Sequence, residues 1–176
     1  ILLLSGLRCS GKSHLRSILN SYFDVDVFDT NSKKTYDTDA NLISPGEVIK
    51  RYGEGETYFL YLENELNHFI EQSKKHTIVI DSVKTPKDIS FFKLKYPSFQ
   101  IITIWLQCDD QIRAQRYIKR DVESNFRNED IVKHDSCLEE IGILSVMKSA
   151  DYIIFTENDV MSQILQLSTV LNRQKI

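Results

Sequence analysis

The chain has 176 residues, enough for one domain that buries a single core. Its 22 Lys and Arg residues and 25 Asp and Glu residues give a net charge of −3, so neither a nucleic-acid-coating surface nor an anionic-membrane binder is expected. No apolar stretch reaches the ~18–20 residues of a membrane span, and residues 1–4 are too short for a signal peptide. Three cysteines without a C-x-x-C pair favour reduced thiols in a cytoplasmic protein.

The first predicted elements are an apolar strand at residues 1–4 and a helix that begins near residue 13. Between them lies Gly6-Leu7-Arg8-Cys9-Ser10-Gly11-Lys12-Ser13, which has the G-x-x-x-x-G-K-S spacing of a phosphate-binding loop. Glycines let the backbone fold back so that N–H groups point into one concavity, and the helix start adds positive potential. We expect Lys12 to reach the β- and γ-phosphates of a nucleotide and the Ser13 hydroxyl to hold Mg²⁺.

Strands and helices alternate along the rest of the chain. Apolar runs predict strands at 25–29, 77–81, 99–106 and 152–155, and periodicity or capping residues predict helices at 45–51, 57–75, 86–94, 109–121, 138–149 and 160–171. Residues 30–44 are expected to form a loop, and the polar stretch 124–135 is expected to be mobile. The alternation predicts an α/β fold of three layers, a five-stranded parallel sheet with helices on both faces.

Two acids come at the carboxyl ends of predicted strands, where ligands of such sheets bind. Asp81 follows a fully apolar strand, and an acid there commonly orients Mg²⁺; the alternative is a turn-capping role. Asp29 has the same placement on the second strand. It could take a proton from an acceptor hydroxyl, brace the metal, or serve only as a turn residue. The phosphate loop, Asp29 and Asp81 are expected to share one crevice.

Arginines on the helix at 109–121 form the other candidate constellation. Arg113, Arg116 and Arg120 are spaced i, i+3 and i+7, so they share one helix face. Phosphoryl transfer needs cations that close over the transferring group, so we predict a lid at about 113–135; the alternative is a solvated basic face. Arg51 could bind an acceptor phosphate or lie on the surface. Cys9 is interpreted as a small residue of the loop or as an oxidation-sensitive thiol.

With these residues placed, the chain resembles the small P-loop kinases of the nucleoside monophosphate kinase superfamily, and within it the dephospho-CoA kinase-like and deoxynucleoside monophosphate kinase-like groups. The resemblance is carried by the phosphate loop and by the segments Val79-Ile80-Asp81-Ser82-Val83-Lys84, Phe91-Phe92, Ile104-Trp105-Leu106 and Arg113-Ala114-Gln115-Arg116. It implies a single kinase domain over residues 1–176. It also implies that Glu157 or Asn158, after the fifth strand, lies near the adenine of ATP.

The sequence therefore predicts a Mg²⁺- and ATP-dependent kinase that acts on a small acceptor, most simply a nucleoside monophosphate or a nucleotide-like molecule. The residues expected to bind ATP are Gly6, Arg8, Cys9, Ser10, Gly11, Lys12, Ser13, His14, Arg113 and Asn158. Lys12, Asp29, Asp81, Arg116 and Arg120 are the expected catalytic residues, Ser13 and Asp81 the metal ligands, and Asp29 and Arg51 the acceptor contacts. Two alternatives remain: a sugar- or shikimate-type hydroxyl kinase, and a nucleotide-binding switch or scaffold within a larger protein.

Overall fold

The structure of the chain, a computed structural model, describes residues 1–30, 57–120 and 128–172, without the side chains at 120 and 128–130. The strands are β1 (Leu2–Ser5), β2 (Val25–Phe28), β3 (Thr77–Ile80), β4 (Ile102–Gln107) and β5 (Tyr152–Phe155). The helices are α1 (Lys12–Tyr22), α3 (Glu63–Gln72), α4 (Pro86–Lys95), α5 (Asp110–Arg120), α6 (Asn128–Glu140), α7 (Ile143–Lys148) and α8 (Val160–Asn172), with a short 3₁₀ helix, η2 (Tyr58–Leu60).

The five strands form one parallel sheet in the order β2-β3-β1-β4-β5, which confirms the predicted fold class. Leu2 pairs with Val79 of β3 on one side and with Ile102 of β4 on the other, so β1 lies in the centre of the sheet. The chain winds from β1 toward β2 and β3, and later toward β4 and β5. The loop after β1 therefore lies where the winding reverses, the position at which such sheets bind ligands.

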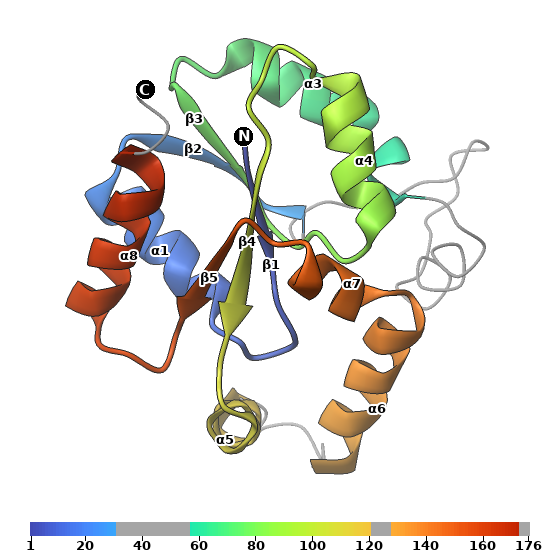
Figure 1. Cartoon of the computed structure of the whole chain (residues 1–176), viewed down its shortest axis with the longest axis vertical. Helices are drawn as coiled ribbons and strands as arrows, with labels where there is room; N and C mark the ends of the chain where they lie inside the picture. Colours follow the sequence, from blue (N-terminus) through green and yellow to red (C-terminus); the bar gives the residue numbers. More distant parts are fainter. Residues whose placement is uncertain (31–56, 121–127, 173–176) are drawn as a thin grey trace.

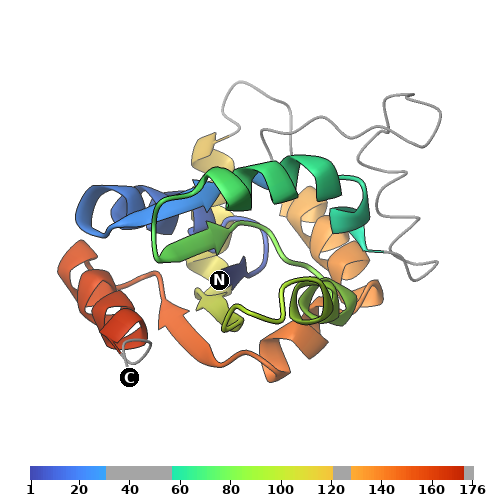
Figure 2. The ribbon, with the colours of Figure 1, turned by 90° about the horizontal axis from the view of Figure 1, so that it is seen from above.

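Helices cover both faces of the sheet, and Figures 1 and 2 show the three layers. On one face α1 and α8 pack over Leu2 and Leu4, while on the other α3, α4 and α7 pack over Leu3. Because side chains of a strand alternate between faces, a strand covered on both sides needs an unbroken apolar run. Residues 2–4 supply that run and are fully buried.

Two helices lie beyond the carboxyl ends of the strands instead of on a face of the sheet. In Figure 1, α5 follows β4 below the sheet, and α6 stands to one side of it and leads into α7. Backbone contacts join α5 to α6 and α6 to α7. These helices therefore border the edge of the sheet at which the phosphate loop and the strand-end acids lie.

Three local predictions are wrong. The stretch 124–135 was expected to be mobile, but α6 occupies it from Asn128 onward, because Ile131 and Leu138, seven residues apart, are both buried. The helix expected at 138–149 is divided by Gly142, whose φ of 97° ends one helix and precedes the next. The helix expected at 57–75 begins as η2, and α3 starts only at Glu63.

Two of the predicted segments, the loop at 30–44 and the helix at 45–51, lie almost wholly outside the described residues. Within the part that the structure describes, none of the helices is both long and apolar enough to cross a membrane.

Candidate active site

The loop between β1 and α1 has the backbone shape that a phosphate cradle needs. Gly6 and Gly11 have φ values of 150° and 97°, which L side chains rarely adopt. A Cβ at Gly6 would lie 2.6 Å from Ser10 Oγ and 2.9 Å from the carbonyl oxygen of Leu106. A Cβ at Gly11 would lie 3.0 Å from Thr156 Cβ. Both glycines are therefore required by the close approach of neighbouring atoms as well as by φ.

Side chains from outside the loop hold three successive carbonyl groups of the loop. Arg113 Nε donates to Arg8 O at 3.0 Å, and Arg116 donates to Cys9 O at 3.4 Å. Thr156 Oγ1 donates to Ser10 O at 2.5 Å. Because the N–H of a peptide unit points opposite to its C=O, the N–H groups of Cys9 and Gly11 are directed to the other side of the loop. The outer contacts thus aim amide donors into the concavity.

Lys12 spans this concavity. Its Nζ donates to Gly6 O at 2.6 Å and to Leu7 O at 3.0 Å. Burial lowers the pKa of Lys12 to about 8, although the charge of Asp81 opposes that change. No side chain caps the start of α1 in the described structure, so Gly11 precedes a helix whose first N–H groups are available to an anion. Together these groups can bind a polyphosphate.

The two strand-end acids lie next to each other and share one cation. Arg16 Nη1 lies 2.5 Å from Asp29 Oδ2 and 3.3 Å from Asp81 Oδ2. Asp81 is fully buried, and burial raises its pKa against the charges of Lys12 and Arg16. Thr30 Oγ1 donates to the carbonyl of Asp81 at 3.0 Å and Ser82 Oγ to its carboxylate at 3.2 Å, which fixes the acid at the mouth of β3.

These oxygen donors suit Mg²⁺, which prefers oxygen ligands and retains several waters. The guanidinium of Arg16 already stands between Asp29 and Asp81, so the position accommodates a positive charge. Within the described ranges no group of three or more His, Cys, Asp or Glu residues could hold a metal. A cation here would therefore draw its other ligands from the Ser13 hydroxyl, from water and from a bound phosphate.

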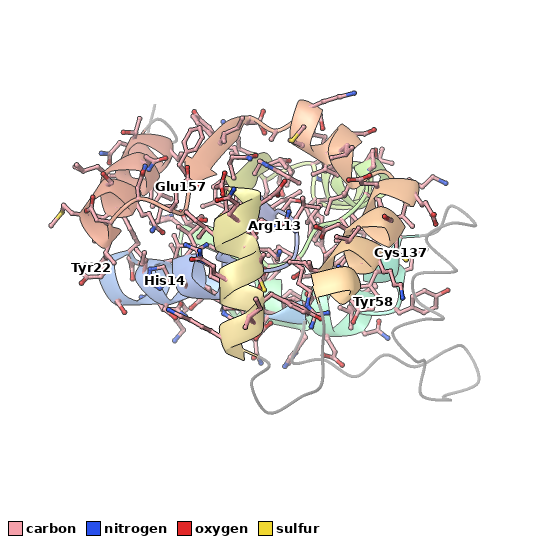
Figure 3. All side chains as sticks on the ribbon, turned by 90° about the horizontal axis from the view of Figure 1, so that it is seen from below. His14, Tyr22, Tyr58, Arg113, Cys137 and Glu157 are labelled. Atoms are coloured by element: carbon pink, nitrogen blue, oxygen red, sulfur yellow. The ribbon has the colours of Figure 1, made fainter. Side chains whose placement is uncertain are left out.

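The loop, Asp81 and α5–α7 line one cavity of about 830 Å³, and Asp29 is not among the lining residues. The residues of the loop and of α1 form one wall, and Asp81, Ser82, Val83 and Lys84 form another. His134, Leu138 and Ile143, from α6 and α7, close a third side. In Figure 3, which views the strand ends from below, α5 crosses the centre, α1 with His14 lies on one side and α6 with Cys137 on the other. The cavity is larger than a phosphate cradle alone requires.

The structure places the predicted arginines beside the loop. Arg113 is only 4% exposed and also contacts Asp110 and Asp135, while Arg116 lines the cavity and donates to Thr156 O at 2.7 Å. Their expected role over the transferring phosphate remains a prediction. Arg51 and the side chain of Arg120 lie outside the described residues.

Two other expected nucleotide contacts can be located. His14 lines the cavity at the start of α1, whereas Asn158 lies after β5, where its carbonyl accepts a hydrogen bond from Gln163 at 2.8 Å. The contact of Asn158 with adenine remains a prediction. Arg8 also packs its guanidinium 5.0 Å from the centre of the Tyr117 ring, which ties the loop to α5.

Sequence reasoning missed Arg16, Thr156 and Lys84. Arg16 follows Ser13 by three residues, so helical spacing alone would have placed it near the Ser13 hydroxyl. Thr156 and Ser10 are 146 residues apart in the chain, and no local pattern indicates their contact. Lys84 lies three residues after Asp81 on a loop whose path depends on Ser82, a non-glycine residue with φ of 70°.

Comparison with solved structures identifies the class of fold. The gluconokinase of Sinorhizobium meliloti has a TM-score of 0.57 at 11% identity, over 99% of this chain and 94% of that one. The shikimate kinase of Bacteroides thetaiotaomicron has a TM-score of 0.55 at 12% identity, over 99% and 98%. The deoxyadenosine kinase of M. mycoides has a TM-score of 0.51 at 18% identity, over 98% of each chain. The chain therefore has the three-layer fold of the P-loop kinases.

Comparison of sequences adds a relative that matches part of the chain. No family model matches the chain. A UPF0200 protein of Methanothermobacter thermautotrophicus is 23% identical over 104 residues, which are 59% of this chain and 54% of that protein. The chain thus spans about half the length of the curated relative that it matches.

Proposed function

We propose that this chain transfers a phosphoryl group from ATP to a small-molecule acceptor, within a single domain of residues 1–176 that has its lid at about 113–135. One observation carries the proposal: the phosphate loop and the strand-end acid Asp81 line the same cavity, which has room beyond the loop for an acceptor. The structural likeness to kinases of three different acceptors supports the reaction class. Which acceptor this chain uses would depend on the side chains that line this cavity.

Each group in the cavity has a role in this proposal. The N–H groups of Cys9 and Gly11 and the start of α1 bind the polyphosphate, and Lys12 neutralises the transferring group. Ser13 and Asp81 hold Mg²⁺, which when bound offsets charge on the phosphates. We assign the acceptor side to Asp29, which pairs with Arg16 of the cavity wall. A nucleoside monophosphate or a nucleotide-like molecule is our first choice of acceptor, and a sugar-type hydroxyl is the alternative.

The test is acceptor-dependent consumption of ATP. The purified chain is incubated with ATP and Mg²⁺, and ADP release is measured with and without nucleoside monophosphates, dephospho-CoA, shikimate and gluconate. We expect one acceptor to stimulate ADP release and to be recovered in phosphorylated form in equal amount. Binding of ATP without turnover on any acceptor would instead favour a switch or scaffold.

The lowered pKa of Lys12 predicts that the protein takes up a proton when it binds a nucleotide at alkaline pH. At pH 8.5, above the pKa of about 8, Lys12 is mostly neutral in the free protein. The charge of a bound polyphosphate raises this pKa, so ADP binding should take up roughly half a proton or more at pH 8.5 and little at about pH 7.2, where Lys12 is already mostly charged and the ADP phosphates are ionised. Calorimetry in buffers of different ionisation enthalpy measures the uptake. Equal proton uptake at both pH values would contradict this assignment.

The position of Arg16 predicts competition with a divalent cation. In an Arg16→Gln variant the two carboxylates lose the charge between them, so Mn²⁺, used as a spin probe for Mg²⁺, should bind the nucleotide-free protein roughly tenfold more tightly. Electron paramagnetic resonance counts free Mn²⁺ directly. Lys119→Gln, an exposed change on α5 with the same loss of charge, is the control. An equal gain in Mn²⁺ affinity in both variants would mean that the net charge of the protein, and not the position of Arg16, controls Mn²⁺ binding.

A further inference from the structure

A second lysine shares the cavity with Lys12. Lys84 lies on the loop between β3 and α4, three residues after Asp81, and lines the cavity. Burial lowers the pKa of Lys12 most, and the charge of Lys84, which lines the same cavity, lowers it further. The charge of Asp81 acts on both. The cavity thus contains two ammonium groups with a carboxylate near each.

The backbone of this loop is fixed from two sides. Ser5 Oγ donates to Val83 O at 2.7 Å, which attaches the loop to the end of β1. The N–H groups of Lys84 and Thr85 both donate to Asp88 Oδ2 at 2.9 Å. Asp88 is itself fully buried at the start of α4. The place from which the Lys84 side chain starts is therefore set before any ligand binds.

The environment of the Lys84 ammonium suits an anion. Its Nζ lies 5.8 Å from the centre of the Tyr58 ring, on the side of the molecule where α6 lies (Figure 3). Burial lowers the pKa of Lys84, and the carboxylates of Asp88 and Asp81 oppose that change. A half-buried ammonium loses hydration energy, and a bound anion would return part of it.

Resting on the kinase function proposed above, we infer that Lys84 binds an anionic group of the acceptor, a phosphate or a carboxylate, so that this site selects charged acceptors over neutral ones. In the proposed function the phosphate loop and Lys12 bind the phosphates of ATP. Lys84 would therefore bind the second substrate, the acceptor. Val83, Leu138 and Ile143 line the same cavity and offer apolar surface to the uncharged part of that molecule.

The test measures acceptor binding to protein saturated with ADP, so that the phosphate loop is filled. Matched pairs are titrated by calorimetry: four nucleoside monophosphates against their nucleosides, and gluconate against glucose. We expect an anionic member to bind at least about tenfold more tightly than its neutral partner, since hydrogen bonds to charged groups are strong. A preference confined to monophosphates identifies phosphate as the anion, and one confined to gluconate identifies carboxylate.

Variants at position 84 decide whether the lysine is responsible. Lys84→Met should remove the preference and leave ADP affinity unchanged, and Lys84→Arg should retain it. Lys93→Met, an exposed change on α4, is the control. An undiminished preference in Lys84→Met, or no preference in the wild-type protein with ADP bound, would overturn the inference alone. Failure of the wild-type protein to bind ADP would overturn the proposed function, and this inference with it.

Discussion

Lys12→Ala is expected to lower acceptor-dependent turnover by ~10²–10³-fold. Lys12 is the cation that spans the phosphate loop, with its Nζ 2.6 Å from Gly6 O and 3.0 Å from Leu7 O. When the terminal phosphate of ATP is transferred, this ammonium would neutralise charge that the loop amides alone cannot offset. The rate is measured as acceptor-stimulated ADP release at saturating ATP and Mg²⁺.

The same variant separates a chemical role from a structural one. Lys119→Ala, exposed on α5, should retain full turnover and thus controls for the loss of one positive charge. Thermal melting should remain within a few degrees of that of the wild-type protein, because among the described residues Lys12 donates its hydrogen bonds to the loop itself. Turnover of Lys12→Ala within about threefold of the wild-type rate would remove the kinase assignment.

Arg113→Met is expected to destabilise the protein by about 2 kcal/mol, because it removes the buried member of a partly buried ion pair. The guanidinium is 4% exposed and serves three acceptors: the carbonyl of Arg8 and the carboxylates of Asp110 and Asp135. Without it, the partly buried carboxylate of Asp135 loses its guanidinium partner, and the loop loses one of its outer contacts. Urea unfolding followed by circular dichroism gives the change in the free energy of unfolding.

A double-mutant cycle assigns that loss to the pair. Arg113→Met combined with Asp135→Asn should be more stable than Arg113→Met alone, because no uncompensated carboxylate remains. Lys119→Met, an exposed change on the same helix, should alter the free energy of unfolding by less than about 0.5 kcal/mol. If Arg113→Met changed the free energy of unfolding as little as this control, the contacts of Arg113 would contribute little to the stability of the fold.

The sequence was sufficient for the fold because the strongest signals are local. The buried strands read as unbroken apolar runs, as at Thr77–Ile80, and the phosphate loop has a spacing that few other structures need. The three-layer order of elements followed from the alternation of strands and helices. The breaks were less predictable: Gly142 ends α6 through its positive φ, and the first turn after Thr57 is 3₁₀ rather than α.

The sequence predicted which residues lie at the site better than it predicted which of them contact each other. Placing Asp29 and Asp81 at strand ends correctly implied that they lie together, but the cation between them, Arg16, comes from a helix and was overlooked. The spacing of Arg113 and Arg116 correctly put them on one face of a helix. Their bonds to loop carbonyls depend on how α5 sits against the phosphate loop, which is a tertiary relationship that no local pattern encodes.

The hydrogen bond from Thr156 to Ser10 has a consequence for the order in which the protein becomes functional during synthesis. The G-x-x-x-x-G-K-S segment is synthesised well before β5, yet one of its carbonyls is held by a residue made 146 positions later. Arg113 and Arg116 also arrive more than one hundred positions after their partners in the loop. A nascent chain therefore carries the complete motif long before it carries a rigid phosphate cradle, and nucleotide should bind tightly only once β5 has joined the sheet.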